Sequence, residues 1–143
     1  MITCHTVHAA MPRLDVNCLC QWVKAVAATY DRHVGDIAYV FVDDDEILRV
    51  NRQFLQHDYY TDIITFDYSQ GNIIGGDLFI SLDTVRSNAE DLGVSYECEL
   101  RRVIIHGILH LCGINDKGPG ERQIMEAAED KALAMLEGEK VRR

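Results

Sequence analysis

The chain has 143 residues, of which 48% are hydrophobic and 26% are charged, as in an ordinary globular domain. This length fits one domain with its own core, and no apolar run approaches the length that spans a bilayer. The net charge of −9 argues against a general binder of polyanions, because phosphate contacts need clustered Lys and Arg. We therefore expect one soluble domain over residues 1–143, with no membrane partner.

The five cysteines are odd in number and lack the spacing of a disulfide framework. This pattern is typical of free thiols in a reducing compartment. Residues 1–14 have no basic start followed by an apolar stretch, so they do not resemble a secretory signal. Both observations predict a cytoplasmic location.

The first elements expected are a helix over residues 14–30 and a strand over residues 36–42. Pro12 precedes the helix, whose apolar residues recur at near-helical spacing and face the core. The strand DIAYVFV is a continuous run rich in β-branched and aromatic residues, which indicates a central strand covered on both faces. The core-facing residues expected in the helix are Leu14, Cys18, Val26 and Tyr30.

Asp43 and Glu46 stand in a capping-box relation, so the acidic cluster before ILRVNRQFL is interpreted as a helix start rather than a metal site. Residues 61–68 and 73–81 are two strands separated by the turn residues SQGN, which predicts a hairpin. A helix then runs from Ser81 to Leu92 and ends at Gly93.

Ser95 is expected to cap a long helix that continues through the histidines to Cys112, with Gly113 just past its end. A last amphipathic helix covers residues 121–137, with Ile124, Ala128, Ala132 and Met135 on its buried side, and the tail GEKVRR frays. The predicted order is helix, strand, helix, two strands and three helices. It indicates an α+β (α/β-like) fold with a single mixed β-sheet of about four strands, packed by about five helices.

His106 and His110 lie four residues apart in HGILHLCGIND, so they project about 40° apart from one face of the helix. Two imidazoles placed in this way can share one metal ion. A catalytic zinc site needs a third protein ligand, and Asp116 can return to the histidines after the turn at Gly113. Asn115 competes for this role, although a neutral amide is a poorer ligand than a carboxylate.

The alternative is that the two histidines are hydrogen-bonded core or groove residues without a metal. Their spacing, the glycine stop and the following carboxylate favour one Zn²⁺ held by His106, His110 and Asp116. Cys112 points away from this face and is interpreted as a small packing residue. The metalloprotease pattern H-E-x-x-H has a glutamate where this chain has Gly107, which would leave space at the metal for an anionic substrate. Metal-assisted hydrolysis of either a peptide or a phosphodiester remains open.

HGILHLCGIND resembles the H-G-x-L-H-L-x-G-x-D-H signature of the YbeY family, metal-dependent endoribonucleases associated with ribosomal RNA maturation. NRQFLQHDYYTDIITFDY resembles the segment N-x-x-Y-R-x-x-D-x-P-T-D-V-L-S-F of that family, and GGDLFIS resembles its G-D-I-x-I-S strand. The segments keep the family's order over roughly residues 36–117. The positions that match outside the histidine helix are Asn51, Asp58, Thr61, Asp62, Phe66, Gly76, Asp77, Ile80 and Ser81.

The chain departs from the family pattern at several chemical positions. The third histidine of the signature is replaced by Asp116 and the aspartate before it by Asn115; a carboxylate ligand would make a metal-bound water less acidic. The arginine that the resemblance implicates in activity is Leu55, which cannot bind phosphate as a guanidinium does. Replacement of a family proline by Tyr60 would change the rigidity of its loop.

Other polar residues are left with two interpretations. His57 could transfer a proton or contact phosphate, or it could be an exposed loop residue. Basic residues near the histidine helix could form a positive rim at the metal or be solvated surface charges. These residues are Arg101, Arg102, Lys117 and Arg122.

The resemblance implies a single-strand-specific, metal-dependent endoribonuclease that acts in rRNA maturation and ribosome quality control, with an rRNA precursor as substrate and the ribosome or ribosomal proteins as further partners. The residues themselves assign no general base. A zinc peptidase that uses a remote acid such as Asp77 is the second hypothesis. The third is a ribosome-associated binding module that keeps the metal for structure.

Overall fold

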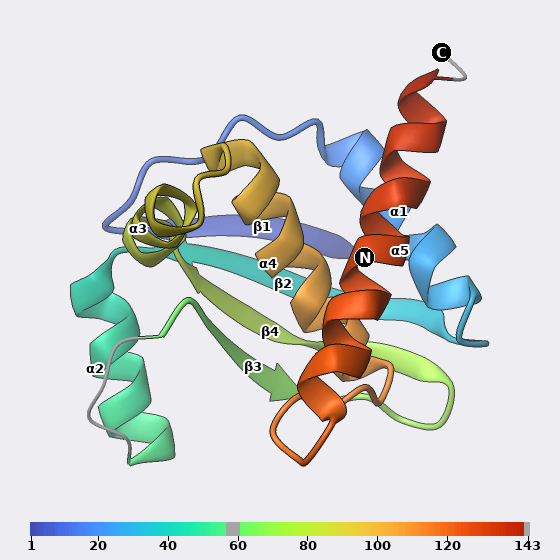
Figure 1. The fold of residues 1–143 in the computed structure, drawn as a ribbon. Helices are drawn as coiled ribbons and strands as arrows, with labels where there is room; N and C mark the ends of the chain where they lie inside the picture. The colour runs from blue at the N-terminus through green and yellow to red at the C-terminus, as the bar shows by residue number, and fades with distance from the viewer. Residues whose placement is uncertain (57–60, 142–143) are drawn as a thin grey trace.

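A computed structural model describes residues 1–56 and 61–141, with side chains described as far as Leu136. One mixed four-stranded sheet organises this part of the chain, in the order β1-β2-β4-β3 (Figure 1). The first three strands in that order are parallel, and β3 pairs with β4 in an antiparallel hairpin. The predicted fold class and the predicted hairpin are both confirmed. The strands are β1 (Ile2–Val7), β2 (His33–Val42), β3 (Ile63–Asp67) and β4 (Ile73–Ser81).

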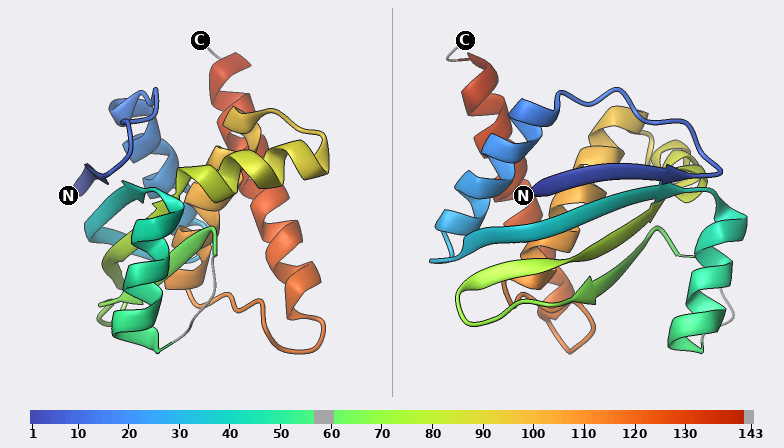
Figure 2. Two further views of the ribbon diagram at one scale, coloured as in Figure 1. Left: turned by 90° about the vertical axis from the view of Figure 1, so that its left-hand side faces the viewer. Right: turned by 180° about the vertical axis from the view of Figure 1, so that it is seen from behind.

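The two faces of the sheet are covered unequally. Four helices lie on one face, and α2 (Asp44–Leu55) packs against part of the other (Figure 2). In β2, Ile37, Tyr39 and Phe41 are buried under the four helices. Ala38 on the other face is only half-buried, so the prediction of a central strand is confirmed but the prediction of full cover on both faces is wrong. The four helices are α1 (Val16–Ala28), α3 (Leu82–Leu92), α4 (Tyr96–Leu111) and α5 (Glu121–Val141).

Strand β1 was not expected, and the predicted order that began with a helix is wrong. Its sequence ITCHTV contains exposed polar residues, and only Ile2 is buried, so it lacks the apolar run that marked the central strand. Its structure comes instead from pairing with β2, in which Ile2 lies opposite Ile37. A parallel edge strand of this kind depends on its neighbour more than on its own composition.

The helix starts follow the expected capping chemistry. The Asp43 carboxylate accepts a hydrogen bond of 2.8 Å from the backbone amide of Glu46, so the acidic cluster is a helix start. Ser81 and Ser95 cap α3 and α4 in the same way. Gly93 ends α3 with a φ of +69°, a left-handed conformation that glycine adopts without strain.

Helix α5 closes the helical layer and was predicted with two errors. Ile124, expected in the core, is 61% exposed, while the neighbouring Met125 is buried. The helix also continues to Val141, beyond the predicted end at residue 137 and into the tail that was expected to fray. The indole of Trp22 on α1 donates a hydrogen bond of 2.8 Å to the Ala132 carbonyl, which joins the first helix to the last. Within the described residues, no helix is both long enough and apolar enough to cross a membrane.

Candidate active-site cleft

One face of α4 carries the polar residues of the site. Glu99, Arg102, His106 and His110 follow one another at spacings of three or four residues, so they lie along a single stripe of the helix. The opposite face of α4 packs on the sheet through residues such as Ile104 and Ile108. The stripe therefore faces α5 and the loop that joins the two helices.

Gly113 returns the chain toward this stripe. Its φ of +98° lies in the left-handed region, and the amide of Ile114 donates to the Leu109 carbonyl to close the helix end. The following loop brings Asp116 back beside His106, at 3.4 Å between Oδ2 and Nε2. The predicted turn and the predicted approach of Asp116 to the first histidine are both present.

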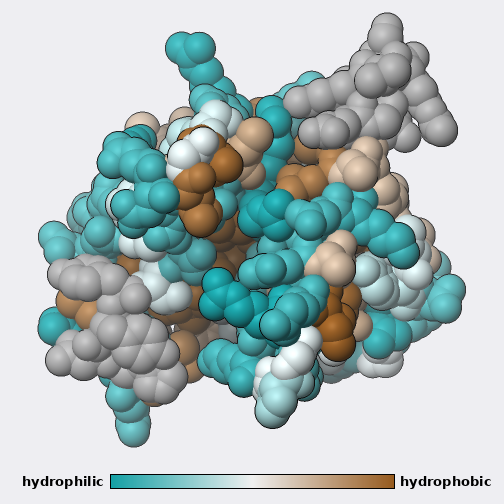
Figure 3. Space-filling view, viewed as in Figure 1, coloured by the Kyte–Doolittle hydropathy of each residue, from teal (hydrophilic) through white to brown (hydrophobic). Residues whose placement is uncertain are grey.

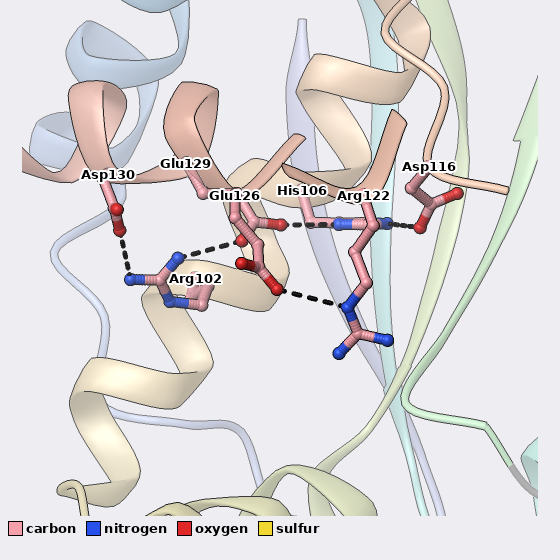
Figure 4. A network of polar contacts seen from close by, with 7 residues as sticks. All are labelled: Arg102, His106, Asp116, Arg122, Glu126, Glu129 and Asp130. Carbon is pink, nitrogen blue, oxygen red and sulfur yellow. Dashed lines mark hydrogen bonds and ion pairs between the residues drawn. The ribbon is translucent and has the colours of Figure 1, made fainter. Parts of the chain in front are cut away.

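His106 lies between two carboxylates (Figure 4). Its Nδ1 is 2.7 Å from Oε2 of Glu129, and its Nε2 faces Asp116. Because an ionised carboxylate can only accept, Nδ1 carries a proton and donates it to Glu129. The imidazole is therefore oriented from one side by α5, and its second nitrogen points toward the loop.

Glu129 is itself held in place by Arg102. The guanidinium donates from Nη1 to Oε1 of Glu129 at 2.9 Å and from Nη2 to Oδ1 of Asp130 at 2.7 Å. Glu129 is 5% exposed, so this buried carboxylate has both oxygens engaged. The hydrogen-bonding capacity of this buried carboxylate is therefore met by a guanidinium and an imidazole, which offsets the cost of its burial.

The electrostatics follow from burial and from these neighbours. Burial opposes protonation of His106, but the hydrogen bond and charge of Glu129, helped by Asp116 and Asp62, raise its pKa above the ordinary value. Burial raises the pKa of Asp62 despite the opposing effect of His106. Burial also raises the pKa of Glu99, and the negative charge of Asp62 adds to the effect. The site gathers negative charge in a partly dehydrated environment, which is a setting that favours a bound cation.

These residues line a cleft of about 1120 Å³ between α4 and α5. Hydrophilic side chains form most of its visible rim, with apolar patches between them (Figure 3). Arg101, Arg102 and Arg122 line the cleft, but Arg102 is paired with α5 carboxylates and Arg122 lies 3.2 Å from Glu126. Of the two interpretations left open, a positive rim is not favoured, because Arg102 and Arg122 are paired with carboxylates. The acidic residues of the lining are Asp62, Asp91, Glu99, Asp116, Glu126, Glu129 and Asp130.

The predicted metal ligands are brought together only in part. Asp116 is half-buried beside His106 while Asn115 is exposed, so the structure favours Asp116 over its competitor. His110 is half-buried one turn along α4, and it is not among the residues that line the cleft. As the side chains stand, no group of three His, Cys, Asp or Glu within residues 1–56 and 61–136 is arranged to hold a metal ion.

Two interpretations of neighbouring residues have different outcomes. Cys112 is buried in the core, where desolvation raises the pKa of its thiol to about 11, so its interpretation as a packing residue is confirmed. Gly107 was expected to leave space at the metal, and this is wrong. A Cβ at Gly107 would lie 3.0 Å from Cδ1 of Ile63 and 3.2 Å from Cδ1 of Leu78, so the glycine allows α4 to approach the sheet closely.

The structure describes only some of the residues in the segment NRQFLQHDYYTDIITFDY, which was compared with the YbeY family. Leu55 ends α2 and is 39% exposed. His57, Asp58 and Tyr60 lie outside the described residues.

Sequence reasoning missed Glu129, and it did not recognise the site roles of Arg102, Glu99 and Asp62. Glu129 lies 23 positions after His106, and nothing local indicates that α5 will place it there. A signal was nevertheless available for two of the residues. Glu99 and Arg102 lie on the same stripe as His106, and this spacing could have been extended back along the helix.

The comparisons with known proteins identify the architecture. The family described as "Endoribonuclease YbeY" matches residues 6–137, and the chain belongs to this family. A relative named "Endoribonuclease YbeY" from Phocaeicola vulgatus is 66% identical over 136 residues, which cover 95% of this chain and 99% of the relative. A relative of the same name from Bacteroides fragilis is 65% identical, with 94% of this chain and 96% of the relative covered.

A solved structure shares the fold. The solution structure of TM1509 from Thermotoga maritima matches with a TM-score of 0.67 and 28% sequence identity, covering 97% of this chain and 91% of that protein. The resemblance noted in the histidine helix, the Asn51 segment and the Gly76 strand is thus confirmed at the level of the whole chain.

Proposed function

We propose that this chain is a metal-dependent endoribonuclease that cuts single-stranded RNA in the maturation of ribosomal RNA and in ribosome quality control. Family membership over nearly the whole length supports the class of reaction. The recessed position of His106 supports the choice of single strands, because a duplex is too wide and stiff to enter a cleft between two helices. We further propose that residues 1–143 act as one metallohydrolase domain in the cytoplasm.

The metal proposed is one Zn²⁺ held by His106, His110 and Asp116. The observation that carries it is the 3.4 Å between Nε2 of His106 and Oδ2 of Asp116. This is longer than an ordinary N–H···O hydrogen bond, and it fits the separation of about 3.3 Å between two ligands that each lie roughly 2.0 Å from one tetrahedral ion. His110 has the correct type and helical position for the third ligand, and its side chain would have to turn toward that point.

The roles of the chain's own residues follow from the contacts. Glu129 holds the proton on Nδ1 of His106 and so leaves the Nε2 lone pair available to a metal ion on the side where Asp116 lies. Arg102 fixes Glu129 through the hydrogen bond from its guanidinium. When bound, the zinc would supply Lewis acidity at a phosphate oxygen and an acidic water. Asp62 acts on the pKa of His106 and has no other role in this mechanism, and no general base is proposed.

The peptidase alternative loses its suggested acid. Asp77 lies on β4 between Gly76 and Leu78, and Leu78 packs in the core beneath α4. Since side chains alternate along a strand, Asp77 points to the opposite face of the sheet from His106. It cannot act as the proton acceptor of a peptidase in this cleft.

The proposal is tested with purified protein loaded with zinc and, separately, stripped with a chelator. We expect the loaded protein to cut a single-stranded RNA, to leave the matching duplex and a peptide library intact, and to lose activity when stripped. Cleavage of peptides with inert RNA would overturn the endoribonuclease proposal in favour of a peptidase. Zinc binding without any cleavage would favour a binding module with a structural metal.

The ligand set is tested by His110→Ala, with His5→Ala on β1 as the matched control. His110→Ala should lose both zinc and RNA cleavage, while His5→Ala should keep both, because His5 is exposed on the far edge strand. If His110→Ala abolished zinc binding but RNA cleavage remained, the mechanism would be wrong.

A further inference from the structure

A second, smaller cavity lies at the end of the molecule where α1 turns into β2. Its volume is about 510 Å³, and its polar lining comes from Lys24, Asp31, Arg32, His33 and Asn72. It is separate from the cleft between α4 and α5, with which it shares no lining residue. Nothing in the proposed cleavage mechanism uses it.

Backbone hydrogen bonds fix the frame of this cavity. Asp31 adopts a left-handed φ of 57°, and the amide of Arg32 donates 3.0 Å to the carbonyl of Ala27. The next amide, of His33, donates 2.7 Å to the carbonyl of Asn72, which ties the turn to the start of β4. Arg32 and His33 therefore project from a defined turn, and Lys24 projects from α1.

The charge of this cavity is opposite to that of the rest of the molecule. Lys24, Arg32 and His33 face one carboxylate, Asp31, in a chain of net charge −9. Within the described residues, neither Lys24 nor Arg32 forms an ion pair, whereas other arginines such as Arg102 and Arg122 do. A half-buried guanidinium without a carboxylate partner is suited to a phosphate, which it can bind with two parallel hydrogen bonds.

The position of the cavity relates it to the proposed active site. Nη2 of Arg32 would lie 4.0 Å from a Cβ built on Gly113, the residue that turns the chain after α4. Gly113 is three positions before Asp116, so Arg32 lies against the same loop that approaches His106. The basic cavity and the cleft therefore both adjoin the loop between α4 and α5, the cavity through Arg32 and the cleft through Asp116.

We propose that Lys24, Arg32 and His33 form a subsite for a backbone phosphate of the RNA strand. This inference rests on the proposed function, because it takes RNA as the substrate. The acidic residues of the cleft repel phosphates, and Leu55 provides no guanidinium, so the protein needs a phosphate-binding site elsewhere. The cavity beside the loop supplies this site through Lys24 and Arg32, which have no ion-pair partner within the described residues.

The test measures binding of a labelled single-stranded RNA to the full-length, zinc-loaded chain, by fluorescence anisotropy between about 50 and 200 mM salt. In the Lys24→Ala/Arg32→Ala variant we expect weaker binding at low salt. The slope of log K against log salt should fall by about one to two, since each lost phosphate contact lowers it by roughly one. Arg32→Lys should keep the slope because it keeps the charge.

Lys131→Ala is the matched control, since it removes an exposed lysine from α5 that lines neither cavity. Lys24→Ala alone, at an exposed position, serves if the double variant does not fold. Wild-type affinity and salt slope in the correctly folded variant would overturn the subsite.

Failure of the subsite and failure of the proposed function give different results. Wild-type chain that binds RNA with the expected salt slope but never cuts it would overturn the endonuclease function and leave the subsite intact. Active chain whose binding ignores Lys24 and Arg32 would overturn the subsite alone. Absence of RNA binding by the wild-type chain would overturn both.

Discussion

The cleft between α4 and α5 and the cavity at the end of α1 differ in how their charges are used. In the cleft, Arg102 and His106 are each engaged by carboxylates at 2.7 to 3.4 Å. In the cavity, Lys24 and Arg32 have no ion-pair partner within the described residues. The first arrangement holds its own side chains in place, whereas the second offers unused charge to a ligand.

This difference indicates that the two regions have different roles, the cleft in holding a metal and the cavity in attracting RNA. A satisfied network gives fixed geometry, which a metal ligand needs, but it has little attraction left for a polyanion. Unpaired cations give attraction and tolerate imprecise geometry. Three substitutions test whether the two regions are specialised in this way, from the largest expected effect to the smallest.

The fixed geometry of the cleft is tested most strongly by Glu129→Gln. This substitution keeps the size of the side chain but removes the charge that orients the Nδ1 proton of His106. We expect the affinity for zinc, measured by competition with a chelator, to fall by about 10- to 100-fold. The ¹⁵N chemical shifts of the His106 ring should also show a mixture of tautomers, which a merely structural role of Glu129 would not produce.

Glu126→Gln is the control for this variant, because Glu126 lines the same cleft and pairs with Arg122 but does not touch His106. It should keep wild-type zinc affinity. Equal zinc affinities for the two variants would show that Glu129 does not position the histidine.

The cost of gathering carboxylates in the cleft is tested by Glu99→Gln. Burial and the charge of Asp62 raise the pKa of Glu99, so the folded state prefers the protonated acid. The stability from this preference is fully present below the ordinary glutamate pKa of about 4.3, and it is lost as the pH rises through the folded-state pKa. At pH 7 the variant should therefore melt higher, by about 2 to 4 °C for roughly 1 kcal/mol.

The gain from Glu99→Gln should shrink as the pH falls toward 4, because the wild-type side chain then becomes neutral as well. Melting temperatures from thermal scans between pH 4 and 7.5 measure it, with the exposed Glu97→Gln as control. A loss of stability at pH 7 would mean that the ionised Glu99 carboxylate supports the fold.

The smallest effect is expected from Leu55→Arg, which places a guanidinium where the family pattern has one. Leu55 is 39% exposed at the end of α2, so an arginine can be accommodated without opening the core. We expect single-stranded RNA to bind about three- to tenfold more tightly, the range of one charge-assisted contact, with unchanged zinc affinity. Leu55→Gln controls for polarity, and identical RNA affinities for the two variants would contradict the idea that the chain lacks a phosphate contact there.

Local chemistry made most of the fold predictable from sequence. Caps such as Asp43 and Ser95 and the stop at Gly113 depend on a few neighbouring residues, and these signals gave the correct helix boundaries. Strand β1 escaped prediction because its structure depends on pairing with β2, and its own composition is largely polar. Ile124 was misplaced because helical periodicity alone does not decide which of two adjacent apolar residues faces the core.

The candidate site was predictable only as far as one helix and its following turn. Asp116 could be placed beside His106 because Gly113 turns the chain within three residues. Glu129 could not, because its position depends on how α5 packs across α4. The same limit explains the error at Gly107, since sequence did not reveal that this side of α4 faces Ile63 and Leu78.

The hydrogen bond from Trp22 to the carbonyl of Ala132 has a practical consequence. Trp22 is the single tryptophan of the chain and is 3% exposed, and its indole contacts the same helix that carries Glu129. Indole emission is sensitive to hydrogen bonding and to water, so the intrinsic fluorescence of Trp22 reports whether α5 stays packed against α1. A red shift on adding RNA would report that α5 moves away from α1, and a constant spectrum would report that the cleft receives its ligand as a rigid body.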